Sequence, residues 1–366
     1  MNGWPLGFAG AVKCVNIVRS PKDAEGLLSN ALRVVSGHRG IAALVFAVVA
    51  ASSGGCAVQS ETDSTESDDG VVLSQTSQAL LTDAELSAFT GLYKSKDAFL
   101  SSCGETPFGS QVYGYAGYEP VAPGPHPVFL YTTGTNLGED GSSYNNPESL
   151  LIVKEMARRG FVAVSVAYAN GGMVADCAQL DAKARCVYQD SPNSAMRAIC
   201  SRSKAGCATK GVVVGGLSQG AMIALRSQNF YSGIKGAWAL SVSDMPVGGS
   251  CMQATGGSRV LANSKVWVTN GAADSLPGTG LSTLQRVTGW PVDGVTYHAA
   301  DATRGGYYQV QGSDLQAGNP GGANHVFYRY DDTENGFSFD ANWFPPASTI
   351  WSLNARLDWL NGRVTH

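Results

Sequence analysis

The sequence predicts an α/β protein with a mostly parallel central sheet and helices on both faces. Apolar stretches with the period of a strand alternate with stretches that have the period of a helix. The chain has 366 residues, of which 44% are hydrophobic and 15% charged, so it can bury a large core. A strand-like run at 211–215 also leads directly into a glycine-flanked serine and a helix-forming segment. We expect one such domain over residues 81–366.

The expected elements alternate along this domain. Runs rich in β-branched and aromatic residues predict strands at 111–118, 127–132, 161–168, 211–215, 235–242, 265–270 and 307–311. Helical periods predict helices at 147–159, 191–203 and 347–361. Asn145 or Asn146 is the expected cap of the first helix, Ser191 followed by Pro192 begins the second, and Gly362 ends the third.

Residues 1–56 have the features of an export signal. An uncharged apolar run at 41–51 follows Arg39 and precedes small residues and Cys56. The run has the length of a signal-peptide core and is shorter than the roughly 20 residues of a transmembrane helix. Cys56 follows two glycines, which resembles a bacterial lipoprotein cleavage site, with Ser53 in place of the usual leucine. We expect export, either with a lipid anchor on Cys56 or with ordinary cleavage nearby.

Residues 57–80 form the expected linker between this signal and the domain. The segment is rich in Ser, Thr, Asp and Glu and contains few large apolar side chains. Such a composition cannot bury enough surface to fold, so we expect a flexible acidic spacer. The whole chain has a net charge of −4 and no cluster of basic residues, which argues against a nucleic-acid partner.

The chain contains eight cysteines, and an even set within an exported domain favours disulfides. We expect the pairs Cys177–Cys186 and Cys200–Cys207, which close short loops, and Cys103–Cys251 as the remaining pair. The cysteine and histidine spacings are not those of a metal site, so we expect no metal ion and no cofactor.

The motif Gly216-Leu217-Ser218-Gln219-Gly220 carries the most specific chemical signal. Ser218 lies at a sharp turn between a strand and a helix, where any Cβ at Gly216 or Gly220 would meet a neighbouring segment. Such a turn strains the serine backbone and presents its hydroxyl at a helix N-terminus, where N–H groups point at developing negative charge. The motif resembles the nucleophile elbow of the α/β-hydrolase superfamily, and its five residues resemble those of cutinases and some carboxylesterases.

A serine hydroxyl needs a base to accept its proton and an acid to orient that base. The resemblance implies that both follow the serine, the acid first and the histidine second. His325, in a glycine-rich loop after the last predicted strand, is the expected base, and His298 is the alternative. Asp274, after a small-residue turn at the end of a predicted strand, is the expected acid, and Asp244 is the alternative.

The resemblance also implies an oxyanion hole made of two backbone N–H groups. One belongs to the residue after the nucleophile, here Gln219. The other comes from the loop after the strand at 127–132, where Thr135 is the first candidate and Gly134 the second.

The expected function is therefore an exported serine hydrolase that cleaves carboxylic esters through an acyl-enzyme intermediate. A serine peptidase, an acyltransferase and a non-catalytic surface protein remain the alternatives. We expect a small-molecule or polymeric ester as substrate and a monomeric protein. We also expect membrane contact only through the N-terminal lipid.

Overall fold

The computed structural model describes residues 79–94, 112–136, 141, 143–244, 251–315, 322–325 and 351–366. These residues belong to one compact unit that begins at Leu73. The predicted export signal and nearly all of the predicted linker lie outside the described residues, so both stay predictions.

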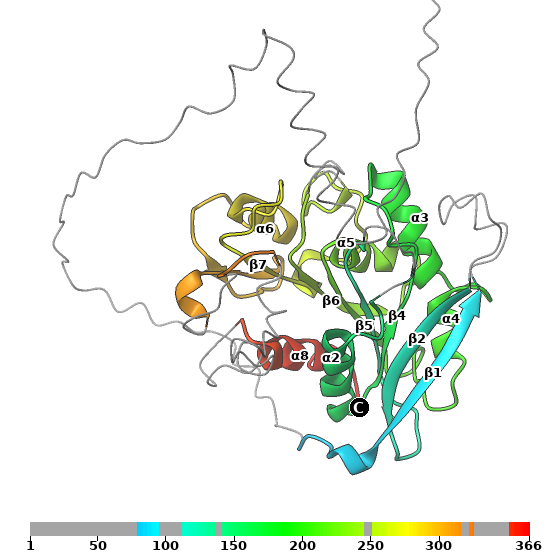
Figure 1. The fold of residues 1–366 in the computed structure, drawn as a ribbon. Coiled ribbons are helices and arrows are strands. Elements are labelled where there is room, and N and C mark those ends of the chain that lie inside the picture. Colours follow the sequence, from blue (N-terminus) through cyan, green and yellow to red (C-terminus); the bar gives the residue numbers. More distant parts are fainter. Residues whose placement is uncertain are drawn as a thin grey trace, which may run out of the picture. The chain divides into compact units, whose positions relative to one another are not determined.

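Within the described part of the chain, a nine-stranded, mostly parallel sheet has the order β1-β2-β4-β3-β5-β6-β7-β9-β8 (Figure 1). The inner strands pair in parallel, and antiparallel pairing occurs where β2 meets β1 and β4 and where β8 meets β9. The strands are β1 (Leu86–Lys94), β2 (Val112–Pro120), β3 (Val128–Thr132), β4 (Val162–Val166), β5 (Val212–Leu217), β6 (Ile234–Leu240), β7 (Val266–Gly271), β8 (Tyr297–His298) and β9 (Gly306–Val310).

Helices cover both faces of this sheet, because neighbouring residues of the inner strands enter two separate apolar cores. Phe129 and Tyr131 of β3 pack into one core, and Val128 and Leu130 pack into the other. The first core contains α2 (Pro147–Arg158) and α8 (Leu353–Asn361), which lie side by side in Figure 1. The second contains α3 (Cys177–Tyr188), α4 (Ala195–Cys200), α5 (Gln219–Leu225) and α6 (Leu281–Thr288).

Each of the predicted strands has a counterpart in the sheet, and the apolar runs that form β3, β4, β5 and β7 are buried along their whole length. The predicted first helix is α2, and Asn146 caps it by accepting a hydrogen bond from the Ser149 N–H at 2.8 Å. Of the predicted third helix, 347–350 lie outside the described residues, and α8 begins at Leu353 after its cap, Ser352.

The second predicted helix begins later than expected. Ser194, not Ser191, is the N-cap of α4, and its Oγ accepts a hydrogen bond from the Arg197 N–H at 3.0 Å. The Ser194 N–H in turn donates to the Ser191 carbonyl at 3.0 Å, so Ser191 and Pro192 belong to a turn before the helix. Proline fits such a turn as well as it fits a helix start, which is why the sequence favoured the wrong serine.

The cysteine pairing differs in part from the prediction. The Cys200–Cys207 disulfide is confirmed, but Cys177 pairs with Cys251, with a Cα–Cα distance of 5.9 Å. The predicted Cys177–Cys186 and Cys103–Cys251 pairs are therefore wrong. Cys177 and Cys186 lie near opposite ends of α3, about 13 Å apart at 1.5 Å per residue, and a disulfide spans about 7 Å at most between Cα atoms. Cys186 is also disulfide-bonded, and Cys103 lies outside the described residues.

These disulfides are typical of proteins from oxidising compartments. No described helix has the length and apolar character needed to cross a bilayer.

Candidate active site

Ser218 occupies the turn between β5 and α5. Its backbone has φ 53° and ψ −118°, a conformation that few non-glycine residues adopt. The Ser218 N–H donates to the Leu240 carbonyl at 2.8 Å, and the Ser218 carbonyl accepts from the Met222 N–H at 3.1 Å. The turn is thus bonded on one side to the end of β6 and on the other to the first turn of α5.

The two glycines of the motif are required by close contacts. A Cβ on Gly216 would meet the backbone of Gly220, and a Cβ on Gly220 would meet the carbonyl oxygens of Thr132 and Thr133. The Thr132 hydroxyl also donates to the Gly220 carbonyl at 3.0 Å. The missing side chains therefore let α5 begin directly against the carboxyl end of β3, as the motif predicts.

His325 and Asp274, which are far apart in the sequence, form a hydrogen-bonded pair. His325 Nδ1 lies 2.7 Å from Asp274 Oδ2, and the side chains are 19% and 1% exposed respectively. The other oxygen of the carboxylate accepts from the Leu276 N–H at 3.0 Å. A buried carboxylate with these partners can fix the tautomer and orientation of an imidazole.

The backbone holds the two members of this pair together. Asp274 follows β7 through a short turn, in which the Ala273 N–H donates to the Ala323 carbonyl at 2.7 Å. A Cβ on Gly271, the last residue of β7, would meet the carbonyl oxygens of Ala323 and Asn324. The loop that carries His325 therefore packs directly on the carboxyl end of β7.

Ser218 and Asp274 follow the carboxyl ends of two parallel strands, so both residues lie at the same end of the sheet. β5 and β7 are separated only by β6, so their ends lie about 10 Å apart, or two strand spacings. The Ser218 hydroxyl has no hydrogen-bond partner among the described residues, so its bond to His325 is not formed here. Such bonds are often long before substrate binds.

The alternative base and acid have other partners. His298 lies on the edge strand β8, where its Nε2 is 3.0 Å from Asp293 Oδ2 and its ring stacks on Trp290 with 3.8 Å between ring centroids. Asp244 forms an ion pair with Arg286 at 2.5 Å. His298 and Asp244 therefore serve local packing, whereas Asp274 and His325 pair with each other.

The loop after β3 lies against Ser218. A Cβ built on Gly134 would lie 3.2 Å from the Ser218 Cβ, so the two backbones approach closely. Within the described ranges, the N–H groups of Gly134, Thr135 and Gln219 donate to no acceptor. Free N–H groups of this kind beside a serine hydroxyl can receive a negatively charged oxygen.

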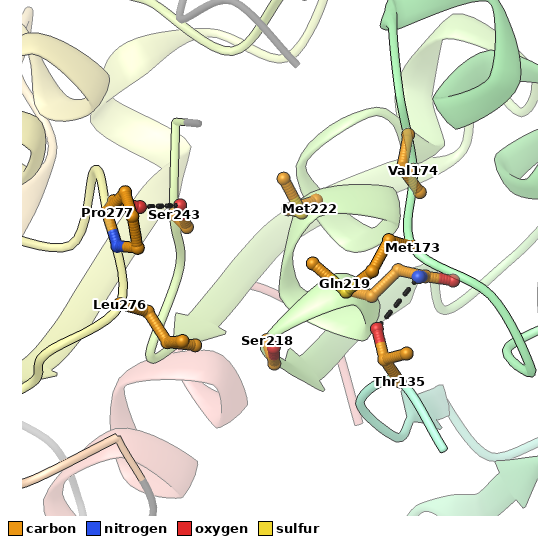
Figure 2. Close-up of a pocket in the computed structure, with 9 residues that line it drawn as sticks. All are labelled: Thr135, Met173, Val174, Ser218, Gln219, Met222, Ser243, Leu276 and Pro277. Atoms are coloured by element: carbon orange, nitrogen blue, oxygen red, sulfur yellow. Dashed lines mark hydrogen bonds between the residues drawn. The ribbon is translucent and has the colours of Figure 1, made fainter. Parts of the chain in front are cut away.

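A cavity of about 300 Å³ opens beside Ser218 (Figure 2). Figure 2 shows Leu276 and Pro277 on one side of Ser218, with methionine and valine side chains on the other. The lining is mostly apolar and consists of Thr135, Met173, Val174, Ser218, Gln219, Met222, Ser243, Leu276 and Pro277. Among the described residues, no three His, Cys, Asp or Glu side chains are grouped so that they could hold a metal ion.

The sequence missed the residues that shape this cavity and surround Gln219. Met173, Val174 and Lys183 belong to a segment of low apolar content, for which the sequence predicted no helix. Met222 lies on α5, four residues after Ser218. This spacing places the two residues on the same face of the helix and was the one sequence signal for its place beside the serine.

No family model matches the chain, and no curated protein matches it significantly. The function must therefore be inferred from the residues of the site.

Proposed function

We propose that this chain is a serine hydrolase with an α/β-hydrolase fold that cleaves carboxylic esters through an acyl-enzyme. The observation that carries the proposal is the Asp274–His325 pair at the same sheet edge as Ser218, whose backbone is strained in a strand–helix turn. The strand order, in which parallel inner strands bring all three residues to one edge, is compatible with this fold.

In the proposed first half-reaction, the Ser218 Oγ attacks the ester carbonyl carbon and His325 accepts the hydroxyl proton. The carbonyl oxygen becomes negatively charged and accepts hydrogen bonds from the Gln219 N–H and from the Thr135 or Gly134 N–H. Asp274 stabilises the imidazolium. His325 then donates the proton to the leaving alkoxide, so the C–O bond breaks, an alcohol departs and an acyl-serine remains.

The second half-reaction reverses the roles of the groups. Water attacks the acyl carbon, His325 accepts one of its protons, and the same N–H groups hold the new oxyanion. The proton then returns to Ser218 Oγ as the acyl–oxygen bond breaks, which releases the carboxylic acid. An alcohol in place of water would make the protein an acyltransferase.

The cavity favours an apolar group on the substrate. Met222 and Val174 line its wall, and Met173 and Leu276, which are 61% and 43% exposed, lie at its surface. Because such side chains gain nothing from a charged or strongly hydrated group, we propose an aliphatic acyl or alcohol group as its occupant. Export and a lipid anchor on Cys56 remain part of this proposal.

The first test is covalent labelling of the folded protein with a fluorophosphonate probe. We expect labelling of the wild type and none of Ser218→Ala. Ser232→Ala replaces an exposed serine in a turn and should label like the wild type. A folded wild-type protein that does not label would support the non-catalytic alternative and refute the proposal.

The second test uses a matched pair of histidine–aspartate contacts. Asp274→Asn should lower kcat for p-nitrophenyl butyrate by about 10⁴-fold and His325→Gln by about 10⁶-fold, as in other triads. Asp293→Asn and His298→Gln remove a similar contact on β8 and should keep kcat. If both pairs behave alike, the assignment of the acid and base is wrong.

The third test separates the reaction classes. Hydrolysis of p-nitrophenyl butyrate without hydrolysis of peptide p-nitroanilides supports an esterase, and the opposite result supports a peptidase. Product analysis with added alcohol detects acyl transfer.

A further inference from the structure

The side chain of Gln219 joins three segments of the chain around the proposed oxyanion hole. Its Nε2 donates to the Thr135 Oγ1 at 2.9 Å and to the Gly172 carbonyl at 2.8 Å, and its Oε1 accepts from the Lys183 Nζ at 3.0 Å (the Thr135 bond is drawn in Figure 2). Gln219 is only 3% exposed. This arrangement uses the amide oxygen and both amide hydrogens.

Lys183 determines the orientation of this amide. A lysine ammonium is only a donor, so the oxygen of Gln219 must face it, and the nitrogen must face Thr135 and the Gly172 carbonyl. Lys183 also donates to the Gly172 carbonyl at 3.1 Å and is itself only 8% exposed. Hydrogen bonds to a charged donor are stronger than neutral ones, more so in a buried site.

Helix α3, which carries Lys183, is fixed at two further points, one on the segment after β6 and one at the end of α5. The Cys177–Cys251 disulfide links the first residue of α3 to the segment after β6. Arg226, the C-cap of α5, binds both oxygens of Asp181 at 2.7 and 2.9 Å and is 1% exposed. The Lys183 ammonium therefore belongs to a rigid support and is not a mobile surface group.

We infer that Lys183 is a positioning residue for the oxyanion hole and acts through the Gln219 side chain. The inference rests on the proposed function. Gln219 and Thr135 each offer a backbone N–H to the oxyanion, and the Gln219 amide fixes the distance between their segments. Lys183 donates a hydrogen bond to the oxygen of that amide and so fixes its orientation. Transition-state stabilisation depends on such preorganised donors, while ground-state binding of the ester depends on the apolar cavity.

Lys183→Met should therefore lower kcat by about 10- to 100-fold with little change in KM, because displaced oxyanion donors cost rates of this order. Inhibition by a trifluoromethyl ketone, which forms a tetrahedral oxyanion on the serine, should weaken by the same factor as kcat/KM. Lys154→Met on α2, which removes an ion pair with Asp83, is the control and should keep both kcat and the inhibition by the ketone unchanged.

A double-mutant cycle separates positioning from direct electrostatic help. Gln219→Leu keeps the backbone N–H and removes the amide, so it should lower kcat about as much as Lys183→Met does. If Lys183 acts through that amide, Lys183→Met should lower kcat no further in the Gln219→Leu background. Thr135→Val removes the hydroxyl that accepts a hydrogen bond from Gln219 Nε2. Thr135 is partly exposed, and the variant should lower kcat while keeping KM.

All rates are referred to active sites titrated with fluorophosphonate, so a loss of folded protein does not count as a loss of kcat. An unchanged kcat in Lys183→Met, with only a lower melting temperature, overturns the inference and leaves the proposed function intact. A full further loss in the Gln219→Leu background overturns it in favour of a direct effect of the charge. A wild-type protein with no labelling refutes the proposed function itself.

Discussion

The strained backbone of Ser218 predicts that removing the candidate nucleophile changes stability in a residue-specific way. Its φ of 53° and ψ of −118° lie far from the left-handed helical well near φ 57° and ψ 47°. A non-glycine residue in such a region costs about 1–3 kcal/mol, which glycine does not pay. Glycine loses about 0.5–1 kcal/mol through the greater freedom of the unfolded chain. Ser218→Gly should therefore be more stable than Ser218→Ala by about 1 kcal/mol.

Urea unfolding of the two variants measures this difference. Both lack the hydroxyl and should not label with fluorophosphonate, so the comparison isolates the backbone term. The midpoint should be higher for Ser218→Gly at an unchanged slope m. At Ser232, an exposed turn residue whose φ is not positive, the order should reverse and Ser232→Gly should be less stable than Ser232→Ala.

Equal stability of the two Ser218 variants, or a less stable glycine variant, would refute the reasoning. In that case the turn would store no strain at this residue. The comparison with a nucleophile elbow would then lose its physical basis.

Three other features give measurable predictions: the crowded Gly271, the Cys177–Cys251 and Cys200–Cys207 disulfides, and the C-terminal His366. Gly271→Ala should lower kcat by about 100-fold, because the added Cβ displaces the loop that carries the candidate base. Gly280→Ala is the control: a Cβ at this position would have no atom within 4 Å, so kcat should not change. Loss of Cys177–Cys251 should cost about 4.5 kcal/mol in the free energy of unfolding, and loss of Cys200–Cys207 about 2.4 kcal/mol, because the bridges span 74 and 7 residues; equal losses in urea unfolding would contradict this. Partial burial lowers the pKa of His366 below 6.5, so the unfolded chain binds this proton more tightly and stability should fall as pH drops from 6.5 through the folded-state pKa. His366→Gln should flatten that pH dependence, and an unchanged slope in the variant would show that another group causes it.

The inner strands could be predicted because their sequence signal is local. β3 and β5 are buried along their whole length and read as short continuous apolar runs. Edge strand β1 was missed because half of the residues 86–93 are exposed and only Tyr93 is buried, so the strand contains no continuous apolar run. Helix α3 was missed because long-range contacts stabilise it, namely the Cys177–Cys251 disulfide and the Arg226–Asp181 ion pair.

The predicted site residues could be placed for a similar reason. Ser218 and Asp274 follow predicted strands directly, and the sheet brings the ends of those strands to one edge. His325 could be assigned only through its order in the chain and its glycine-rich loop, and the pairing with Asp274 required coordinates. The Lys183–Gln219 contact had no sequence signal, because it joins the elbow to a helix that the sequence did not predict.

The convergence of the site residues depends first on positions that lack a side chain. Gly134, Gly216, Gly220 and Gly271 each lie where an added Cβ would meet another segment of the site. A methyl group at any of them would separate Ser218 from the proposed oxyanion loop, helix α5 from the sheet, or the loop that carries His325 from β7. The backbone therefore brings the candidate site residues to one end of the sheet, and side-chain contacts such as Lys183–Gln219 can then adjust their distances. We therefore expect a mutation at one of these glycines to impair the site at least as much as loss of the lysine does.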